Sequence, residues 1–337
     1  MAEIKRVKYF TKDKEKFILP NNQKLYDKYL QSNILKNPDV KSTTYNVYSN
    51  YFKQFLIWLG ENYKDLGLYD EEFMTDAVDI LEGYMAFCQS ELNNHKKIIN
   101  TKLSAISSFY IWSAKRGLIK YHPFQNKLDR MKKAQDEHIL TSYFLNKEQI
   151  EEIRKSLYAE DSKWELQDKI LFEVSLFSGN RIGALEKLTL SSLNLEEMVF
   201  ENIREKEGYR VSVPFENTCK DMIETWLSMR HDNFDKLQCD ALFIHKVKDE
   251  TYEPLKRGAL YQRMVKFGKI IGIEDFRPHC MRKTCINQIY EESGDLNLAS
   301  QWANHKSSAV TQASYIKPVS KADLRKKLMD IKKNNKE

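Results

Sequence analysis

The stretch STTYNVYSNYFKQFLIWLG, residues 42 to 60, decides the fold class of the first half of the chain. It opens on Ser and Thr residues that can cap a helix. Large apolar side chains then recur at the spacing of one helical face, at Tyr48, Tyr51, Phe52, Phe55 and Leu59. Gly60 is the predicted end of the element. The stretch therefore predicts an amphipathic helix.

Three further segments around this stretch share its period. Residues 75–92 and 95–117 each carry an apolar face, and Gly117 ends the second. An earlier helix is expected around NQKLYDKYLQSN, residues 22–33. Four helices joined by short loops are typical of a helix bundle. We therefore expect a four-helix N-terminal domain over residues 1–130.

The bundle is followed by a segment that has no period. Residues 131–142 are rich in charge and lie inside NKLDRMKKAQDEHILTSYF. Because 337 residues exceed the usual size of one core, two domains are expected, and this segment is the predicted linker. The second domain is then predicted to span residues 143–337.

The second domain is predicted to be mainly α with a small β-sheet. Helices are expected over 145–158, with Asn146 and Gln149 as a capping box, and over 164–179. The alternating segments MVFENIRE and YRVSVPF predict a hairpin of two or three strands. From residue 217 the pattern predicts helix almost to the end of the chain.

Composition excludes several classes of protein. The 54 Lys+Arg and 48 Asp+Glu give a net charge of +6, which permits a nucleic-acid partner without requiring one. No apolar run is long enough for a signal core or a membrane span, so a soluble, cytoplasmic protein is expected. The five cysteines form no CxxC pair and the seven histidines no metal-binding motif. We expect no metal and no cofactor.

The motif RPHCMRKT, residues 277 to 284, places His279 and Arg282 three positions apart at a predicted helix start. Residues i and i+3 share a helical face, so the pair can present an imidazole and a permanent cation to one phosphate. Taken alone, the motif also fits a purely structural interpretation, in which His279 caps or packs the helix start and Arg282 makes a surface ion pair.

Three other motifs of the second domain extend this pattern. SGNRIGALEKLTLSSL places Arg181 near a helix start, REKEGYRVSVP places Lys206 in a hairpin turn, and NHKSSAVTQASY contains His305 and Tyr315. In this order and at these separations, the four motifs resemble the tyrosine recombinase family, which is lambda-integrase-like. The resemblance covers residues 144 to 318 and, more loosely, the preceding bundle, which resembles the SAM-like core-binding domain of that family.

Cleaving a phosphodiester without a metal requires cations on the phosphate, a nucleophile in line and an acid for the leaving oxygen. Arg181 and Arg282 suit the first task because both hold phosphate bidentately. The resemblance implies that Tyr315 is the nucleophile and forms a 3′-phosphotyrosyl link. It implies His279 as general base, Lys206 as the acid for the 5′ oxygen, and His305 as a hydrogen-bond donor to phosphate. A solvated hairpin tip for Lys206, and a purely supporting role for His305, stay open.

The chain departs from the family pattern at three positions. Ala184 stands where an acidic residue is usual, with Glu186 two positions later. Asn304 replaces the usual Gly before the second histidine, and Lys283 replaces a frequent His. None of these changes removes a reacting group. Cys280 is expected to serve helix packing.

The resemblance also implies the partners of the protein, which are double-stranded DNA and further copies of the chain, as a tetramer in synapsis. DNA contacts are expected from Lys96, Lys97, Thr101 and Lys102 near a helix N-terminus. A solvated face is the alternative for each lysine. The tail, residues 321–337, is predicted to be a helix that docks on a neighbouring protomer.

The expected function is therefore site-specific DNA recombination through a Holliday junction, by an integrase or transposase of a mobile element. Two alternatives remain: supercoil relaxation of the type IB topoisomerase kind, and a DNA-binding module that has lost catalysis.

Overall fold

The computed structural model describes residues 9–36, 42–132, 143–205, 209–234, 239–247 and 251–317, together with positions 321, 324, 325 and 329. The chain divides into two compact units, 1–139 and 140–337. The division falls inside the range 131–142 that the sequence predicts as a linker. Each unit has its own hydrophobic core.

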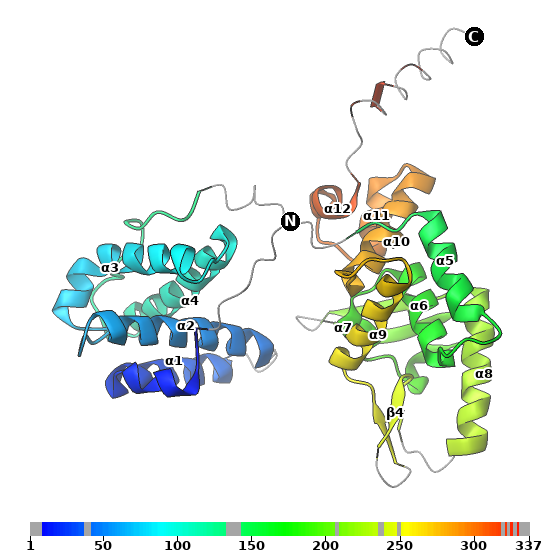
Figure 1. Ribbon diagram of the computed structural model, residues 1–337, viewed down its shortest axis with the longest axis horizontal. Helices are drawn as coiled ribbons and strands as arrows, with labels where there is room; N and C mark the ends of the chain where they lie inside the picture. Colours follow the sequence, from blue (N-terminus) through cyan, green and yellow to red (C-terminus); the bar gives the residue numbers. More distant parts are fainter. Residues whose placement is uncertain are drawn as a thin grey trace. The chain divides into compact units, whose positions relative to one another are not determined.

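The first unit is built from helices (Figure 1). A short 3-10 helix, η1 (Lys12–Phe17), precedes four α-helices, α1 (Pro20–Lys36), α2 (Ser42–Asn62), α3 (Glu71–Ser90) and α4 (Lys96–Lys115). Their core is largely aromatic: the ring of Tyr26 stacks on Phe52 with centroids 4.1 Å apart, and Phe109 packs beside Phe52. The predicted bundle is confirmed in the described residues.

Gly60 does not end α2, which continues to Asn62. A Cβ atom at Gly60 would lie 1.9 Å from the carbonyl oxygen of Phe17. The glycine therefore allows η1 to cross the helix closely, and the prediction of a helix stop there is wrong.

The second unit mixes helices with two small sheets (Figure 1). Its helices and 3-10 turn are α5 (Lys147–Tyr158), α6 (Leu166–Ser178), α7 (Ile182–Leu185), η2 (Leu190–Ser192), α8 (Asn217–Phe234), α9 (Arg257–Ile270), α10 (Pro278–Ser293), α11 (Leu296–Trp302) and α12 (Ser308–Tyr315). Its strands are β1 (Leu193–Asn194), β2 (Val199–Arg204), β3 (Arg210–Pro214), β4 (Ile244–Lys246) and β5 (Tyr252–Pro254). The fold class, mainly α with a small sheet, is confirmed.

The antiparallel sheet β1-β2-β3 contains the predicted hairpin, with Phe200 opposite Val213 and Arg204 opposite Arg210. The backbone N–H of Glu205 donates to the carbonyl oxygen of Tyr209 at 2.6 Å and closes the hairpin at its turn end. The prediction of helix from residue 217 onward is wrong at β4 and β5, which form a second hairpin. The sequence LFIHKV has a short apolar run in place of an alternation, and such a run does not distinguish a strand from a helix.

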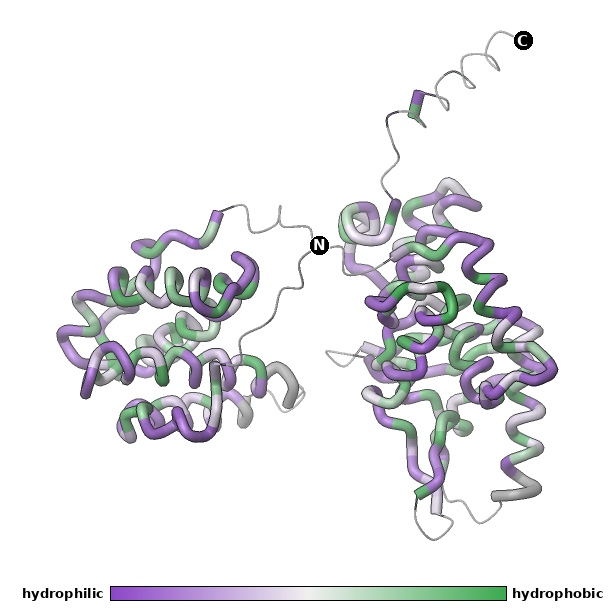
Figure 2. The backbone as a smooth tube through the Cα atoms, viewed as in Figure 1, coloured by the Kyte–Doolittle hydropathy of each residue, from purple (hydrophilic) through white to green (hydrophobic). Residues whose placement is uncertain are grey.

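Helix α6 is the centre of the second unit. Ten of its thirteen residues are buried, since it packs against α5, α8, α10 and β3. At its N-terminal neighbour α5, the capping box of Asn146 and Gln149 is confirmed, with the Asn146 side chain accepting from the Gln149 N–H. Figure 2 shows hydrophobic and hydrophilic residues alternating along the helices of both units. Among the described residues, none of the helices is both long and apolar enough to span a bilayer.

Candidate active site

The site is organised by the start of α10, where Pro278 occupies a first-turn position that requires no N–H donor. His279 and Arg282 follow on one face of this helix, and both contact the ring of Tyr315. The His279 and Tyr315 ring centroids are 5.2 Å apart, and the Arg282 guanidinium carbon lies 5.3 Å from the Tyr315 centroid. The i, i+3 spacing thus brings both side chains to one tyrosine.

Arg282 is almost completely buried, with 2% of its surface exposed. Its Nη1 donates to the carbonyl oxygen of Gly179 at 2.7 Å, and its Nη2 donates to that of Ala303 at 2.6 Å. Its Nε donates to the hydroxyl of Tyr315 at 3.3 Å. These bonds compensate the burial of a cation that would otherwise be costly, although burial still lowers the pKa of Arg282.

The C-terminal carbonyls of α6 explain why Arg282 is held here. A helix leaves its last carbonyl groups without internal partners. Cys285 donates to the carbonyl oxygen of Phe177, Trp302 to that of Ser178, and Arg282 to that of Gly179. A cation at this end also complements the helix dipole. Arg282 therefore has a structural task besides any chemical one.

Tyr315 is the last residue of α12, and 6% of its surface is exposed. It packs in a small apolar cluster with Ile286, Ala299 and Ala303. The chain just beyond it is fixed to α10, because the Lys317 N–H donates to the side-chain oxygen of Asn287 at 2.9 Å. These contacts place the hydroxyl of Tyr315 beside Arg282 within the same chain.

His305 connects Arg282 to α12. Its Nε2 lies 3.0 Å from Nη2 of Arg282, and its Nδ1 lies 2.8 Å from the hydroxyl of Thr311. An arginine only donates, so Nε2 accepts and the proton belongs on Nδ1. Burial, then the charges of Arg282 and Arg181, lowers the pKa of His305 to about 4. His305 is therefore neutral at pH 7.

His279 is neutral at pH 7 for a similar reason. Desolvation, followed by the charges of Arg282, Lys283 and Arg181, lowers the pKa of His279 to about 4. Its side chain retains an exposed edge, and in the described part of the chain it makes no hydrogen bond. A neutral imidazole with free nitrogens can accept a proton.

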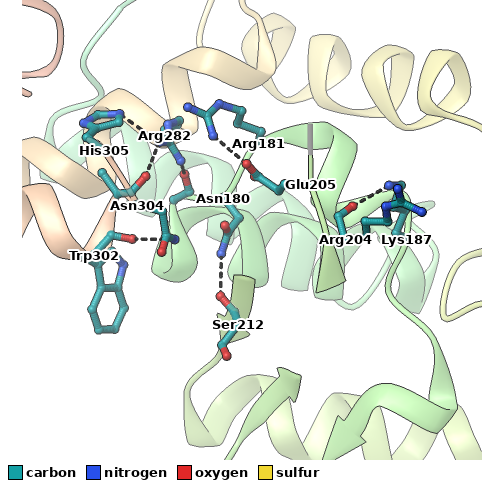
Figure 3. Close-up of polar contacts among 12 residues, drawn as sticks. Asn180, Arg181, Lys187, Arg204, Glu205, Ser212, Arg282, Trp302, Asn304 and His305 are labelled. Atoms are coloured by element: carbon teal, nitrogen blue, oxygen red, sulfur yellow. Dashed lines mark hydrogen bonds and ion pairs between the residues drawn. The ribbon is translucent and has the colours of Figure 1, made fainter. Parts of the chain in front are cut away.

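Arg181 lies on the opposite side of the site, at the N-cap of α7. Its side chain is 46% exposed, and its Nη1 forms an ion pair with Oε2 of Glu205 at 2.6 Å (Figure 3). The adjacent Asn180 donates to the carbonyl oxygen of Ser212 in β3, which fixes the turn before α7 to the sheet. Lys206 follows Glu205 directly and lies outside the described residues.

The departures from the family pattern have structural explanations. Ala184 is fully buried in the core of the unit, and Glu186 accepts a hydrogen bond from the N–H of Arg257 at the start of α9. Asn304 has φ 53°, in the left-handed region that asparagine tolerates better than most residues. Lys283 lies over the ring of Phe144 at 5.1 Å. Cys280 is buried and accepts from the Tyr143 N–H, as expected of a packing residue.

The DNA-contact residues expected in the first unit lie in the first two turns of α4. Lys97 is exposed and Lys96 half-buried, while the Thr101 hydroxyl donates to the carbonyl oxygen of Lys97. Lys102 is only 2% exposed and its Nζ lies 3.5 Å from the sulfur of Cys88. The prediction of a DNA contact by Lys102 is wrong, because its ammonium group points into the core. Its spacing from Ile99 and Ile106 was the signal for a buried face.

Sequence reasoning missed three residues of the site. Thr311 contacts Nδ1 of His305, Gly179 supplies a carbonyl to Arg282, and Glu205 holds Arg181. Of these, only Gly179 had a signal, as a glycine directly after a helical run. Within the described ranges, no group of three or more His, Cys, Asp or Glu side chains is arranged to hold a metal ion.

Comparison with known proteins gives one family. The model of the phage integrase family matches residues 143–321, which is more than half of the chain. The tyrosine recombinase XerC of Staphylococcus saprophyticus is 22% identical over 268 residues, covering 80% of this chain and 84% of the relative. XerC of Mannheimia succiniciproducens is 24% identical over 219 residues, covering 65% of this chain and 70% of the relative.

Solved structures agree in fold. The XerH site-specific recombinase in a post-cleavage complex with a palindromic difH substrate matches with a TM-score of 0.65 and 16% identity, over 84% of this chain and 78% of that one. A lambda integrase dimer bound to a COC′ core site matches with a TM-score of 0.60 and 15% identity, over 89% of this chain and 99% of that one.

Proposed function

This chain belongs to the phage integrase family, and from that premise we propose that it is a site-specific DNA recombinase with Tyr315 as its nucleophile. The single observation that carries the proposal is the Tyr315 hydroxyl, hydrogen-bonded to the buried Arg282 and flanked by the rings of two neutral histidines. No ordinary packing requirement explains this convergence of groups around one hydroxyl.

In the proposed cleavage step, the Tyr315 oxygen attacks the scissile phosphorus while the bond to the 5′ oxygen breaks. The tyrosine proton passes to His279, which is unprotonated at pH 7. The negative charge of the bound phosphate offsets the neighbouring cations and so strengthens this base. The leaving 5′ oxygen takes its proton from Lys206. The 3′-phosphotyrosyl bond conserves the energy of the phosphodiester, so that a 5′ hydroxyl from another strand can reverse the step.

The two arginines stabilise the charge that develops on the non-bridging oxygens. Arg181 is open to a ligand, with one of its five N–H donors engaged by Glu205. Arg282 has most of its donors engaged by Gly179, Ala303, His305 and Tyr315. A phosphate can bind its remaining Nη1 donor directly, and the Nε donor becomes available as the Tyr315 oxygen moves toward phosphorus.

His305 changes its role when phosphate binds. In the unbound protein its Nε2 accepts from Arg282, so it can donate to phosphate only after taking up a proton. The negative charge of DNA favours that protonation, since it offsets the arginine charges that lower the His305 pKa. We assign His305 the task of donating to a phosphate oxygen in the bound state.

The DNA grip and assembly follow from the same proposal. Lys96, Lys97 and Thr101 near the start of α4 are assigned to phosphate contacts. Lambda integrase has been solved as a dimer on a core site, and we propose that this chain likewise assembles on duplex DNA, as a tetramer that passes through a Holliday junction. Strand exchange for a mobile element is the proposed biological role.

A covalent-capture experiment tests the function and identifies the target sequence at the same time. The full chain is incubated with a library of nicked duplexes of random sequence, and protein-linked DNA is isolated under denaturing conditions and sequenced. We expect a consensus target from the wild type and no adduct from Tyr315→Phe, with Tyr209→Phe as an exposed-tyrosine control. If no adduct forms while sequence-specific binding persists, the protein is a binding module; sequence-independent relaxation of supercoils indicates topoisomerase activity.

A further inference from the structure

Glu205 is a buried acid beside a predicted catalytic arginine, and the mechanism above gives it no task. Only 9% of its surface is exposed, although it belongs to a hairpin that carries exposed charges. Its Oε2 accepts from Nη1 of Arg181 at 2.6 Å. Its backbone N–H donates to Tyr209 and closes the same hairpin. Glu205 thus joins the turn before α7 to the turn end of the β2 and β3 hairpin.

The position of the carboxylate matters because of what is absent at 184. Position 184, one helical turn after Arg181, holds an alanine that is fully buried among apolar residues, so this turn of the chain offers the arginine no carboxylate. The nearest later acid on that segment, Glu186, is committed to the N–H of Arg257. Among the described residues, Glu205 is the acid that contacts Arg181, and it reaches the arginine from a different element.

The positive charge around the site indicates what the contact between Glu205 and Arg181 does. Arg181, Arg282, His279 and His305 converge without DNA, and the positive charges of the arginines lower the pKa of both histidines. Glu205 offsets part of that repulsion. It also fixes one edge of a guanidinium that is 46% exposed and otherwise free to change rotamer. Four N–H donors of Arg181 remain for a phosphate.

We propose that Glu205 is a positioning residue for Arg181, supplying from the hairpin a carboxylate that the helix after Arg181 does not offer to it. This inference rests on the proposed recombinase function. Glu205 does not touch the reacting atoms; it holds the planar fork of Arg181 in the orientation that receives the scissile phosphate.

The first test is a double-mutant cycle on the captured target, in single-turnover cleavage. Glu205→Gln keeps the shape and removes the charge; we expect the rate to fall about 10- to 100-fold with the DNA dissociation constant changed less than about twofold. In an Arg181→Lys background the same change should cost much less, since an ammonium has no fork to orient. Glu201→Gln, an exposed acid on the same strand, should cleave at the wild-type rate.

Three results would overturn the assignment. A wild-type or faster rate for Glu205→Gln would make the carboxylate irrelevant or a competitor of phosphate. An equal loss in both backgrounds would show that it does not act through Arg181. If Glu205→Gln lowered the DNA affinity and the thermal unfolding midpoint together with the rate, Glu205 would be a structural residue only.

A second measurement does not depend on cleavage. In the full chain labelled with [15N]arginine, the Arg181 guanidinium signal is identified as the one lost in Arg181→Lys. Its N–H protons should exchange with water several-fold faster in Glu205→Gln than in the wild type or Glu201→Gln. Unchanged exchange refutes the contact even if the protein cleaves DNA, and faster exchange supports it even if no adduct is ever found.

Discussion

The two arginines assigned to one phosphate are held in opposite ways. Arg282 is 2% exposed and donates to carbonyl groups at the end of α6 and in the segment after α11. It also donates to the hydroxyl of Tyr315 on α12. We call Arg282 and these partners the closed half of the site. Arg181 is 46% exposed and bonded to Glu205 on the β2 and β3 hairpin, which we call the open half. The Arg282 side chain is part of the buried interior, whereas the half-exposed guanidinium of Arg181 is held by its ion pair with Glu205.

The different exposure of the two arginines predicts different effects of substitution on folding stability and on the cleavage rate. A change in the closed half removes hydrogen bonds from buried groups, so it must lower the free energy of unfolding as well as the cleavage rate. A change in the open half leaves solvent able to replace what is lost, so it should lower the rate with little change in stability. The predictions below are ordered by the expected change in the free energy of unfolding.

Arg282→Lys should have the largest effect. A lysine has one compact ammonium and cannot reach the carbonyl oxygens of Gly179 and Ala303 and the Tyr315 hydroxyl together. We expect a loss of about 3 kcal/mol in urea unfolding and a cleavage rate at least about 100-fold lower. A variant with wild-type stability would show that Arg282 is not part of the closed interior.

Gly179→Ala should come next. Gly179 has φ 60°, and an added Cβ would lie 2.9 Å from the sulfur of Cys285. We expect about 2 kcal/mol of destabilisation and reduced cleavage, since the Gly179 carbonyl orients Arg282. Gly294→Ala is the matched control: its φ is 67° but nothing lies within 4 Å, so only the backbone cost of about 1 kcal/mol should appear. Equal losses for the two variants would contradict the steric argument.

Acid should weaken the closed half through His305. Its folded pKa of about 4 lies below the unfolded value, which is about 6.5. Between these values the unfolded chain binds a proton that the folded chain does not. The free energy of unfolding should therefore fall as the pH decreases from 6.5 toward 4, and this contribution is complete above that window.

The wild type and His305→Asn, compared by urea unfolding at pH 7, 6 and 5, isolate this contribution from other titrating groups. The variant should lose less stability on acidification than the wild type does. Parallel pH profiles for the two proteins would exclude His305 as a source of the acid sensitivity.

Arg181→Lys should have the smallest effect on folding. A lysine keeps a cation near Glu205, so we expect the free energy of unfolding to stay within about 0.5 kcal/mol of the wild type. The cleavage rate should still fall by about 10- to 100-fold, because the bidentate grip on phosphate is lost. Together with Arg282→Lys, this variant tests the division into two halves: similar destabilisation by both would abolish it.

The sequence was informative where a pattern is local. The period of residues 42–60 predicted a helix, which α2 confirms, and the Asn146 to Gln149 spacing predicted a capping box that is present. The i, i+3 relation predicted that His279 and Arg282 share a face, and both do contact Tyr315. Each of these features depends on backbone geometry within a few residues.

The sequence misled where a residue type was interpreted without its surroundings. Lys102 was predicted to contact DNA because it lies near a helix N-terminus, but the apolar neighbours on its face of α4 place it in the core. Gly60 looked like a helix stop, but another segment crosses it. The β4 and β5 hairpin was hidden by the charged residues between its two short strands.

The sequence by itself determined the helical class, the expectation of two domains divided around 131–142, and the order of the predicted site residues from Arg181 to Tyr315, because these depend on periodicity and on residue identity along the chain. Only the tertiary structure decided that Glu205 pairs with Arg181, that Thr311 meets Nδ1 of His305, and that Arg282 binds the end of α6. Those contacts join residues brought together by packing, and the separation of two residues in sequence carries no information about which carbonyl or carboxylate a buried cation will meet.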